Sequence, residues 1–101
     1  MSIRHLDSLF EPRSIAVIGA SDRPASVGAT VWHNVRAAPF AGPRWAVNPR
    51  LARLGDDPVF ARIEDLPEAP ELAVVCTPAD TVPTIIAALG ARGAKAAIVL
   101  T

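Results

Sequence analysis

A loop of small and polar residues follows the first apolar run of the chain and is suited to binding a phosphate. The apolar run ends at Gly19, and the loop continues to Gly28, where helical spacing takes over. Free backbone N–H groups and the dipole at a helix N-terminus favour an anion there. Gly19 allows a tight turn, and Gly28 lets the helix pack close to the strand. The spacing differs from GxGxxG, so an ordinary turn without a ligand remains an alternative.

A second loop separates classes of nucleotide. An NAD site generally has Asp or Glu at the end of its second strand to hold the ribose hydroxyls, whereas this chain has Val47, Asn48, Pro49 and Arg50 there. Arg50 is suited to a phosphate on the ribose, as in NADP or in the 3′-phosphate of coenzyme A. A solvated surface arginine is the alternative.

The sequence predicts no catalytic residue and no metal site. His5, His33 and Cys76 lie far apart in the sequence, and a metal site needs several clustered ligands. We expect both histidines at the surface and Cys76 as a small core residue that ends a buried strand. Trp32 and Trp45 are expected to pack in the core and not to stack on a base.

Alternating strands and helices must position these loops. Continuous apolar runs, typical of strands covered on both faces, predict strands at 14–20, 44–48, 72–76 and 96–101. A short third strand is expected at 58–60, followed by a turn of helix or a loop at 63–67. The pattern indicates one α/β domain with a Rossmann-like, doubly wound parallel sheet, in which ligands bind beyond the carboxyl ends of the strands.

The first helix is predicted from valines spaced four residues apart, Val27, Val31 and Val35, with Ser26 as its N-cap. Pro39 and the Gly-Pro pair at 42–43 end it.

A second helix follows the strand at 72–76, with Asp80 or Thr81 as its cap and Gly90 or Gly93 at its end. Its predicted apolar face consists of Val82, Ile85, Ile86 and Leu89.

Composition excludes several classes of protein. The formal net charge is zero, with ten basic and ten acidic residues and no run of like charge, so we expect neither nucleic acid nor a membrane as partner. A lone cysteine and the lack of a signal peptide's apolar core favour the cytoplasm.

The apolar strand at 96–101 would normally be covered by a helix or a neighbouring strand. We therefore expect the chain to be the N-terminal fragment of a larger protein, with homo-oligomerisation through that edge as a hypothesis.

Several motifs in order carry a resemblance over nearly the whole chain. They lie at 9–21, 26–28, 47–49, 65–67 and 75–79. With them the chain resembles the CoA-binding domain of NDP-forming (ADP-forming) acyl-CoA synthetases, which are similar to the succinyl-CoA synthetase α subunit. The same module also occurs fused to protein lysine acetyltransferases.

The resemblance implies a set of residues that bind coenzyme A. Phosphates would lie on Ser21 and the turn at 26–28, the adenosine among residues 47–50, and the thiol end next to Thr101. The implied cofactor-binding residues are Gly19, Ala20, Ser21, Ser26, Val27, Gly28, Val47, Asn48, Pro49, Arg50, Cys76, Thr77, Pro78, Val82 and Thr101. One departure is Ala25, where relatives often have Gly and where a Cβ could narrow the phosphate loop.

The resemblance also implies the function. The chain would bind coenzyme A or acyl-CoA for an acid–CoA ligase, whose phosphorylated histidine and ATP or ADP belong to domains absent from this chain. Its partners would be coenzyme A and the remaining domains or subunits of the synthetase. One alternative is a regulatory or scaffold module in an acetyltransferase fusion. An NADP-binding oxidoreductase domain ranks lowest, because the chain lacks the GxGxxG spacing of the dinucleotide-binding fingerprint.

Overall fold

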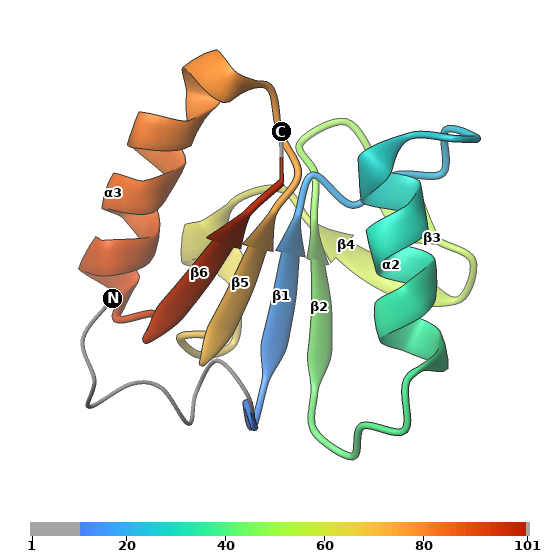
Figure 1. Cartoon of the computed structure of the whole chain (residues 1–101), viewed down its shortest axis with the longest axis horizontal. Coiled ribbons are helices and arrows are strands. Elements are labelled where there is room, and N and C mark those ends of the chain that lie inside the picture. Colours follow the sequence, from blue (N-terminus) through green and yellow to red (C-terminus); the bar gives the residue numbers. More distant parts are fainter. Residues whose placement is uncertain (1–10, 101) are drawn as a thin grey trace.

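One six-stranded sheet forms the centre of the computed structural model, which describes residues 11–100. The strands follow the order β3-β4-β2-β1-β5-β6, and every neighbouring pair is parallel except β3 and β4. Figure 1 shows β6, β5, β1 and β2 side by side, with their carboxyl ends at one edge. The strands are β1 (Ile15–Ile18), β2 (Arg44–Val47), β3 (Arg53–Leu54), β4 (Asp57–Phe60), β5 (Leu72–Val75) and β6 (Ala96–Val99).

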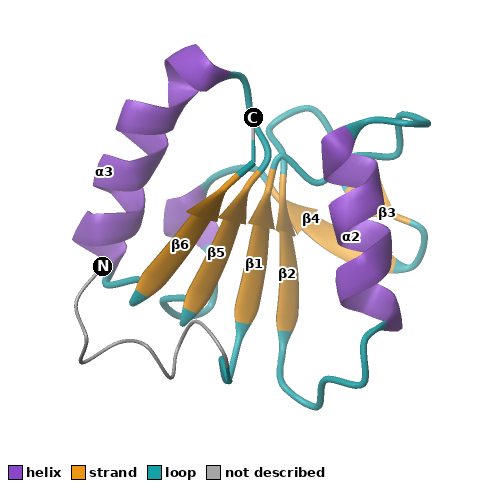
Figure 2. Cartoon of the chain, in the orientation of Figure 1, coloured by secondary structure: helices purple, strands orange, loops and turns teal. Residues whose placement is uncertain are grey.

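Helices cover the two faces of the sheet, as predicted for a doubly wound fold (Figure 2). On one face α2 (Val27–Ala37) packs on a cluster that contains Val17 and Trp32. On the other, α3 (Val82–Arg92) and the 3-10 turn η2 (Ile63–Asp65) pack on a cluster that contains Ala16 and Ile18. Successive residues of β1 thus point into different cores, which explains its unbroken apolar sequence.

The predicted strands are confirmed, each somewhat shorter than its apolar run, and the expected short strand at 58–60 is part of β4. No pattern in the sequence indicates β3, because a strand of two residues has no measurable periodicity. Gly55, with φ of 61°, lies in the turn that lets β3 pair antiparallel with β4.

The first helix begins at its predicted cap, but its first valine is not in the core. The Ser26 hydroxyl oxygen accepts a hydrogen bond from the Ala29 N–H at 3.2 Å. Val27 is the first residue of α2, as the spacing predicts, and it is 50% exposed because it lies ahead of the part of the helix that packs on the sheet. Trp32 is buried in the core, while Val31 and Val35 pack against it.

The second helix differs from its prediction at two points. Ile86 is 40% exposed and lies off the buried face, where Leu89 is covered. Thr81 occupies the N-cap position, but its side chain makes no capping hydrogen bond to α3. Thr81 is also the last residue of the short 3-10 turn η3 (Ala79–Thr81), and its hydroxyl group is hydrogen-bonded within the segment that precedes α3. Gly93, with φ of 97°, ends the helix, and Gly90 lies inside it.

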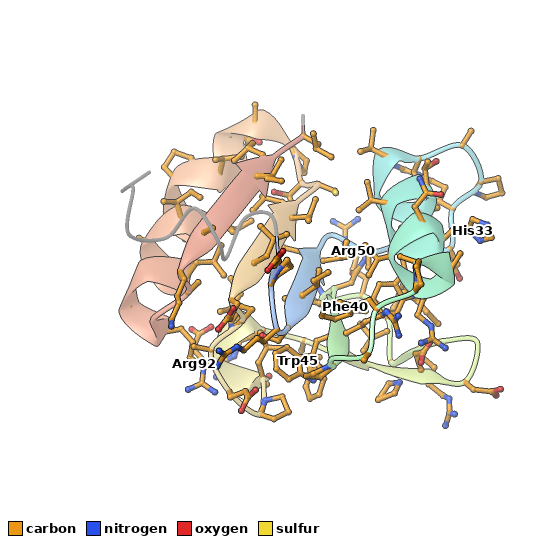
Figure 3. All side chains as sticks on the ribbon, turned by 60° about the horizontal axis from the view of Figure 1, so that its bottom comes forward. His33, Phe40, Trp45, Arg50 and Arg92 are labelled. Atoms are coloured by element: carbon orange, nitrogen blue, oxygen red, sulfur yellow. The ribbon has the colours of Figure 1, made fainter. Side chains whose placement is uncertain are left out.

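The remaining expectations concern exposure. His33 lies exposed on the outer side of α2, away from the sheet (Figure 3), and Trp45 packs against the core on the α3 side. The edge strand β6 is largely exposed, as expected for an apolar edge strand with no covering element after it in residues 11–100. Ala96 is buried, while Ile98 and Val99 are exposed. His5 lies outside the described residues.

The close approach of α2 to the end of β1 explains the glycine at position 28. A Cβ built on Gly28 would lie 2.0 Å from the carbonyl oxygen of Gly19, far inside van der Waals contact. The end of β1 and the first turn of α2 can therefore touch only because this residue has no side chain.

Replacing Gly28 with Ala is expected to lower the free energy of unfolding by about 2 to 3 kcal/mol or more, because the helix must move away from the strand. Urea denaturation of the two proteins measures the difference. Gly90→Ala is the matched control, since a Cβ there meets nothing within 4 Å, and it should stabilise the helix by roughly 0.5 to 1 kcal/mol. A Gly28→Ala protein as stable as the unaltered chain would contradict the contact.

Ala25 is the one non-glycine residue among residues 11–100 with a positive φ, 64°. L-residues pay about 1 to 2 kcal/mol in this left-handed conformation, so Ala25→Gly is expected to stabilise the domain by up to about 1 kcal/mol. Thermal unfolding followed by circular dichroism tests this. The control Ala87→Gly, at an exposed position inside α3, should destabilise by about 1 kcal/mol.

Candidate functional site

A pocket of about 750 Å³ opens at the carboxyl ends of the central strands. Its walls come from the loops after β1, β2, β4 and β5 and from the side of α3. The volume lies within the range of small-molecule sites. The chain leaves β1 toward β2 through α2 and leaves β5 toward β6 through α3, on the opposite face, so the pocket lies at the switch point of the sheet.

The loop after β1 forms the first wall with Gly19, Ser21, Asp22 and Arg23. The Ser21 hydroxyl oxygen accepts from the Arg23 N–H at 2.9 Å, which fixes the turn. Asp22 and Arg23 are exposed at the rim. The turn therefore presents backbone and an arginine to the pocket just ahead of the N-terminus of α2.

The loop after β2 forms the second wall and is fastened to the first. The Asn48 amide nitrogen Nδ2 donates to the Ala20 carbonyl oxygen at 2.9 Å, and Asn48 Oδ1 accepts from the Arg50 N–H at 2.8 Å. Both functional atoms of this side chain thus have partners within the protein. The exposed Arg50, labelled in Figure 3, lies on the loop that Asn48 holds in place.

The loop after β5 forms the third wall, with Cys76, Thr77 and Pro78. Burial raises the pKa of the Cys76 thiol above its ordinary value, so the thiol is protonated at neutral pH. It is therefore a weak nucleophile. The half-buried Cys76 packs against the core on the α2 side and also lines the pocket, so its predicted place at the end of a buried strand is confirmed.

The fourth wall is an apolar slot between η2 and α3. The buried Ile63 faces it from η2, and Ile85 and Ala88 face it from α3. Arg62 and Glu64, both exposed, lie at its rim, and Arg62 forms a long 4.0 Å ion pair with Asp65. An apolar slot with charged residues only at its mouth can hold a flat or aliphatic part of a ligand while a polar part remains outside.

Most of the residues singled out from the sequence come together here. Nine of them line the pocket: Gly19, Ser21, Val47, Asn48, Pro49, Arg50, Cys76, Thr77 and Pro78. Thr101 lies outside the described residues.

Five of the predicted residues lie near the pocket without lining it. Ala20 is buried on the α2 side, and Val82 packs against the opposite core. The Ser26 hydroxyl donates to the Arg23 carbonyl oxygen at 2.7 Å while it caps α2, so its hydrogen is already used. Val27 and Gly28 follow inside the helix.

The sequence reasoning did not assign the other residues that line the pocket. These are Ile18, Asp22, Arg23, Leu51, Ala61, Arg62, Ile63, Glu64, Thr81, Thr84, Ile85 and Ala88. The segment at 61–64 directly follows β4, so the rule that ligands lie beyond strand ends would have included it once β4 was placed. No pattern in the sequence indicates which turn of α3 faces η2.

The charges around the pocket favour an anionic ligand. Three arginines, Arg23, Arg50 and Arg62, line it together with two acids, Asp22 and Glu64. No group of three or more His, Cys, Asp or Glu side chains that could hold a metal occurs within residues 11–100. Neither described helix is long and apolar enough to cross a membrane. The geometry is therefore that of a site that binds a ligand with separate anionic and apolar parts.

Solved structures resemble this one closely. The acetyl-coenzyme A synthetase 1 of Ca. Korarchaeum cryptofilum, a dinucleotide-forming enzyme solved with phosphate and ADP, superposes with a TM-score of 0.89 at 33% identity, over 95% of this chain and 21% of that one. A conserved hypothetical protein from Pyrococcus furiosus shares the fold at 22% identity, with a TM-score of 0.78 over 87% of this chain and 74% of its own.

Curated relatives agree. The chain is 36% identical to a trans-feruloyl-CoA synthase from an unknown prokaryotic organism, over 97% of this chain and 14% of the synthase. It is 33% identical to the ADP-forming acetate–CoA ligase I of Archaeoglobus fulgidus, over 95% of this chain and 14% of the ligase. The chain thus spans about a seventh of the length of these relatives. The family model described as "CoA binding domain" matches residues 13–101, and the chain therefore belongs to the CoA-binding domain family.

Proposed function

We propose that the pocket at the carboxyl ends of β1, β2 and β5 binds coenzyme A, and that the chain supplies this cofactor to an acid–CoA ligase. The observation that carries the proposal is the combination of a turn ahead of the N-terminus of α2, three arginines from three different segments, and an apolar wall in one pocket. Coenzyme A combines three phosphates with an adenine ring and a pantetheine arm, so it needs both environments. When bound it supplies a thiol that accepts an acyl group.

The turn between β1 and α2 is suited to the diphosphate. It lies ahead of a helix whose first N–H groups and dipole favour an anion. The Ser26 hydroxyl already donates to the Arg23 carbonyl oxygen, whereas Ser21 only accepts a hydrogen bond and keeps its own hydrogen. We therefore expect backbone N–H groups, the Arg23 guanidinium and the Ser21 hydroxyl, and not the Ser26 hydroxyl, to contact the diphosphate.

The turn at 48–50 is suited to the 3′-phosphate and poorly suited to NAD. An NAD site would use a carboxylate here to accept from two free ribose hydroxyls. Asn48 replaces it, and its amide already has partners in Ala20 and Arg50. The exposed Arg50 guanidinium would pair with a phosphate on the ribose through charge-assisted hydrogen bonds.

The ligase assignment is supported by the kinds of protein in which related domains occur. The matched relatives include ADP-forming acetate–CoA ligases and the alpha subunit of such a ligase from Pyrococcus furiosus, which is 30% identical over 89% of this chain and 20% of the subunit. We propose that other domains or subunits of this protein bind ATP or ADP and carry the reacting histidine. In this arrangement the described residues bind, orient and present the cofactor.

Replacing Arg50 with Ala is expected to weaken coenzyme A binding roughly 10- to 100-fold, because one charged hydrogen-bonding partner of the 3′-phosphate is lost. Isothermal calorimetry of the chain against coenzyme A and 3′-dephospho-CoA measures this. The unaltered chain should prefer coenzyme A, and the variant should bind the two ligands alike.

Arg53→Ala is the matched control, since Arg53 is an exposed arginine three residues away, on β3 and outside the pocket, and its variant should bind as the unaltered chain does. Preference of the unaltered chain for NADP over coenzyme A would contradict the proposal.

Coenzyme A is also expected to protect Cys76 from alkylation, because this thiol lines the pocket. Its raised pKa makes the thiolate scarce at neutral pH, so reaction with iodoacetamide should be slow at pH 7 and accelerate as the pH rises through that pKa. Mass spectrometry at pH 9 follows the modification with and without S-methyl-coenzyme A, whose blocked sulfur does not consume iodoacetamide as the free thiol of coenzyme A would. Equal labelling with saturating ligand would place the cofactor elsewhere.

A further inference from the structure

Two threonine side chains beside the pocket form a short chain of hydrogen bonds. The hydroxyl oxygen Oγ1 of Thr81 lies 2.7 Å from Thr77 Oγ1 and 2.6 Å from the carbonyl oxygen of Pro78. Both distances are typical of O–H···O hydrogen bonds. Both threonines line the pocket and are half-buried.

The number of hydrogens fixes the direction of this chain. A threonine hydroxyl has one hydrogen, and a carbonyl oxygen can only accept. Thr81 must therefore donate to Pro78, since two oxygens 2.6 Å apart without a hydrogen between them would repel each other. The contact between the threonines then needs its hydrogen from Thr77. As a result the Thr77 hydroxyl offers only lone pairs to a ligand.

Thr77 lines the pocket beside the end of β1. A Cβ built on Gly19 would approach the Thr77 methyl carbon Cγ2 to 3.0 Å, so Thr77 packs directly against the end of the central strand β1. The turn that carries Arg23, the turn that carries Arg50 and the apolar slot between η2 and α3 line the same pocket.

The ribose is the part of coenzyme A that connects three groups, which matches a pocket with two arginine-bearing turns and one apolar slot. It carries the 5′-diphosphate, the 3′-phosphate and the adenine, which leave it in three directions. With the diphosphate on the turn ahead of α2 and the 3′-phosphate at Arg50, as proposed above, the ribose would lie at the junction of the two turns and the adenine would be directed toward the slot. Its one free hydroxyl is the 2′-hydroxyl, which can donate a hydrogen bond.

We propose that Thr77 Oγ1 accepts a hydrogen bond from the ribose 2′-hydroxyl of coenzyme A and makes the site specific for a ribonucleotide. This inference rests on the proposed function. An oxygen without a free hydrogen repels a phosphate oxygen, so Thr77 contributes to orienting the sugar and not to holding phosphate. A single neutral acceptor suffices here because only one ribose hydroxyl of coenzyme A is free, whereas the carboxylate of an NAD site accepts from two.

The test compares adenosine 3′,5′-bisphosphate with its 2′-deoxy analogue by isothermal calorimetry, with coenzyme A as a reference. These two probes contain the adenosine and both attachment phosphates and differ in one hydroxyl. The unaltered chain is expected to bind the ribonucleotide roughly 5- to 10-fold more tightly, the effect of one neutral hydrogen bond. Thr77→Val, which keeps the shape, should remove this preference while it leaves binding of the deoxy analogue nearly unchanged.

Two further variants make the result specific. Thr77→Ser keeps the hydroxyl and should keep the preference, so it separates the hydrogen bond from any disturbance of the fold by Thr77→Val. Thr30→Val removes an exposed hydroxyl on α2, outside the pocket, and should also leave the preference intact. Equal binding of the two bisphosphates by the unaltered chain, or a preference that survives Thr77→Val, would overturn the role of Thr77 while coenzyme A binding stands. Failure of the unaltered chain to bind coenzyme A or either bisphosphate would overturn the proposed function and this inference with it.

Discussion

The contact between Gly28 and the carbonyl group of Gly19 determines where each part of the binding site lies. Neither position has room for a side chain: a Cβ on Gly28 would meet the Gly19 carbonyl oxygen at 2.0 Å, and a Cβ on Gly19 would meet the Cys76 carbonyl oxygen at 2.8 Å. The end of β1 is therefore enclosed by α2 on one side and by the loop after β5 on the other. This close packing brings the N-terminus of α2 and the side chain of Thr77 to opposite sides of one residue.

Hydrogen bonds across the strand ends hold the loops of the site in one arrangement. The Gly19 N–H donates to Val47 and the Cys76 N–H donates to Ile18, both at 2.8 Å, continuing the sheet pattern into the loops. Asn48 joins the first two loops through its side chain. A ligand that binds here meets a surface that is already ordered, so little conformational entropy is lost on binding.

The sequence predicted the features that depend on local pattern and missed those that depend on tertiary placement. The strand positions, the Ser26 cap and the parallel sheet follow from apolar runs and from residues with clear local preferences, and the structure has them. Val27 and Ile86 fit the helical spacing but are exposed, because spacing gives the side of a helix and not how far its ends extend past the sheet. The slot formed by Ile63, Ile85 and Ala88 joins two segments about twenty residues apart in the sequence, and no motif in either one indicates the other.

The central position of β1 has a consequence for the order in which the chain can fold. Its two neighbours are β2 and β5, and the register pairs Ile15 with Arg44 on one side and with Leu72 on the other. The central strand β1 thus cannot acquire both partners until the chain has been made past residue 75. Pairing between segments this far apart in the sequence slows folding, because the loop must close before its contacts stabilise it. The turn that follows β1 likewise has its complete surroundings only after Cys76 and Thr77 have been made, so a nascent chain contains the residues of this turn long before both neighbouring loops are in place.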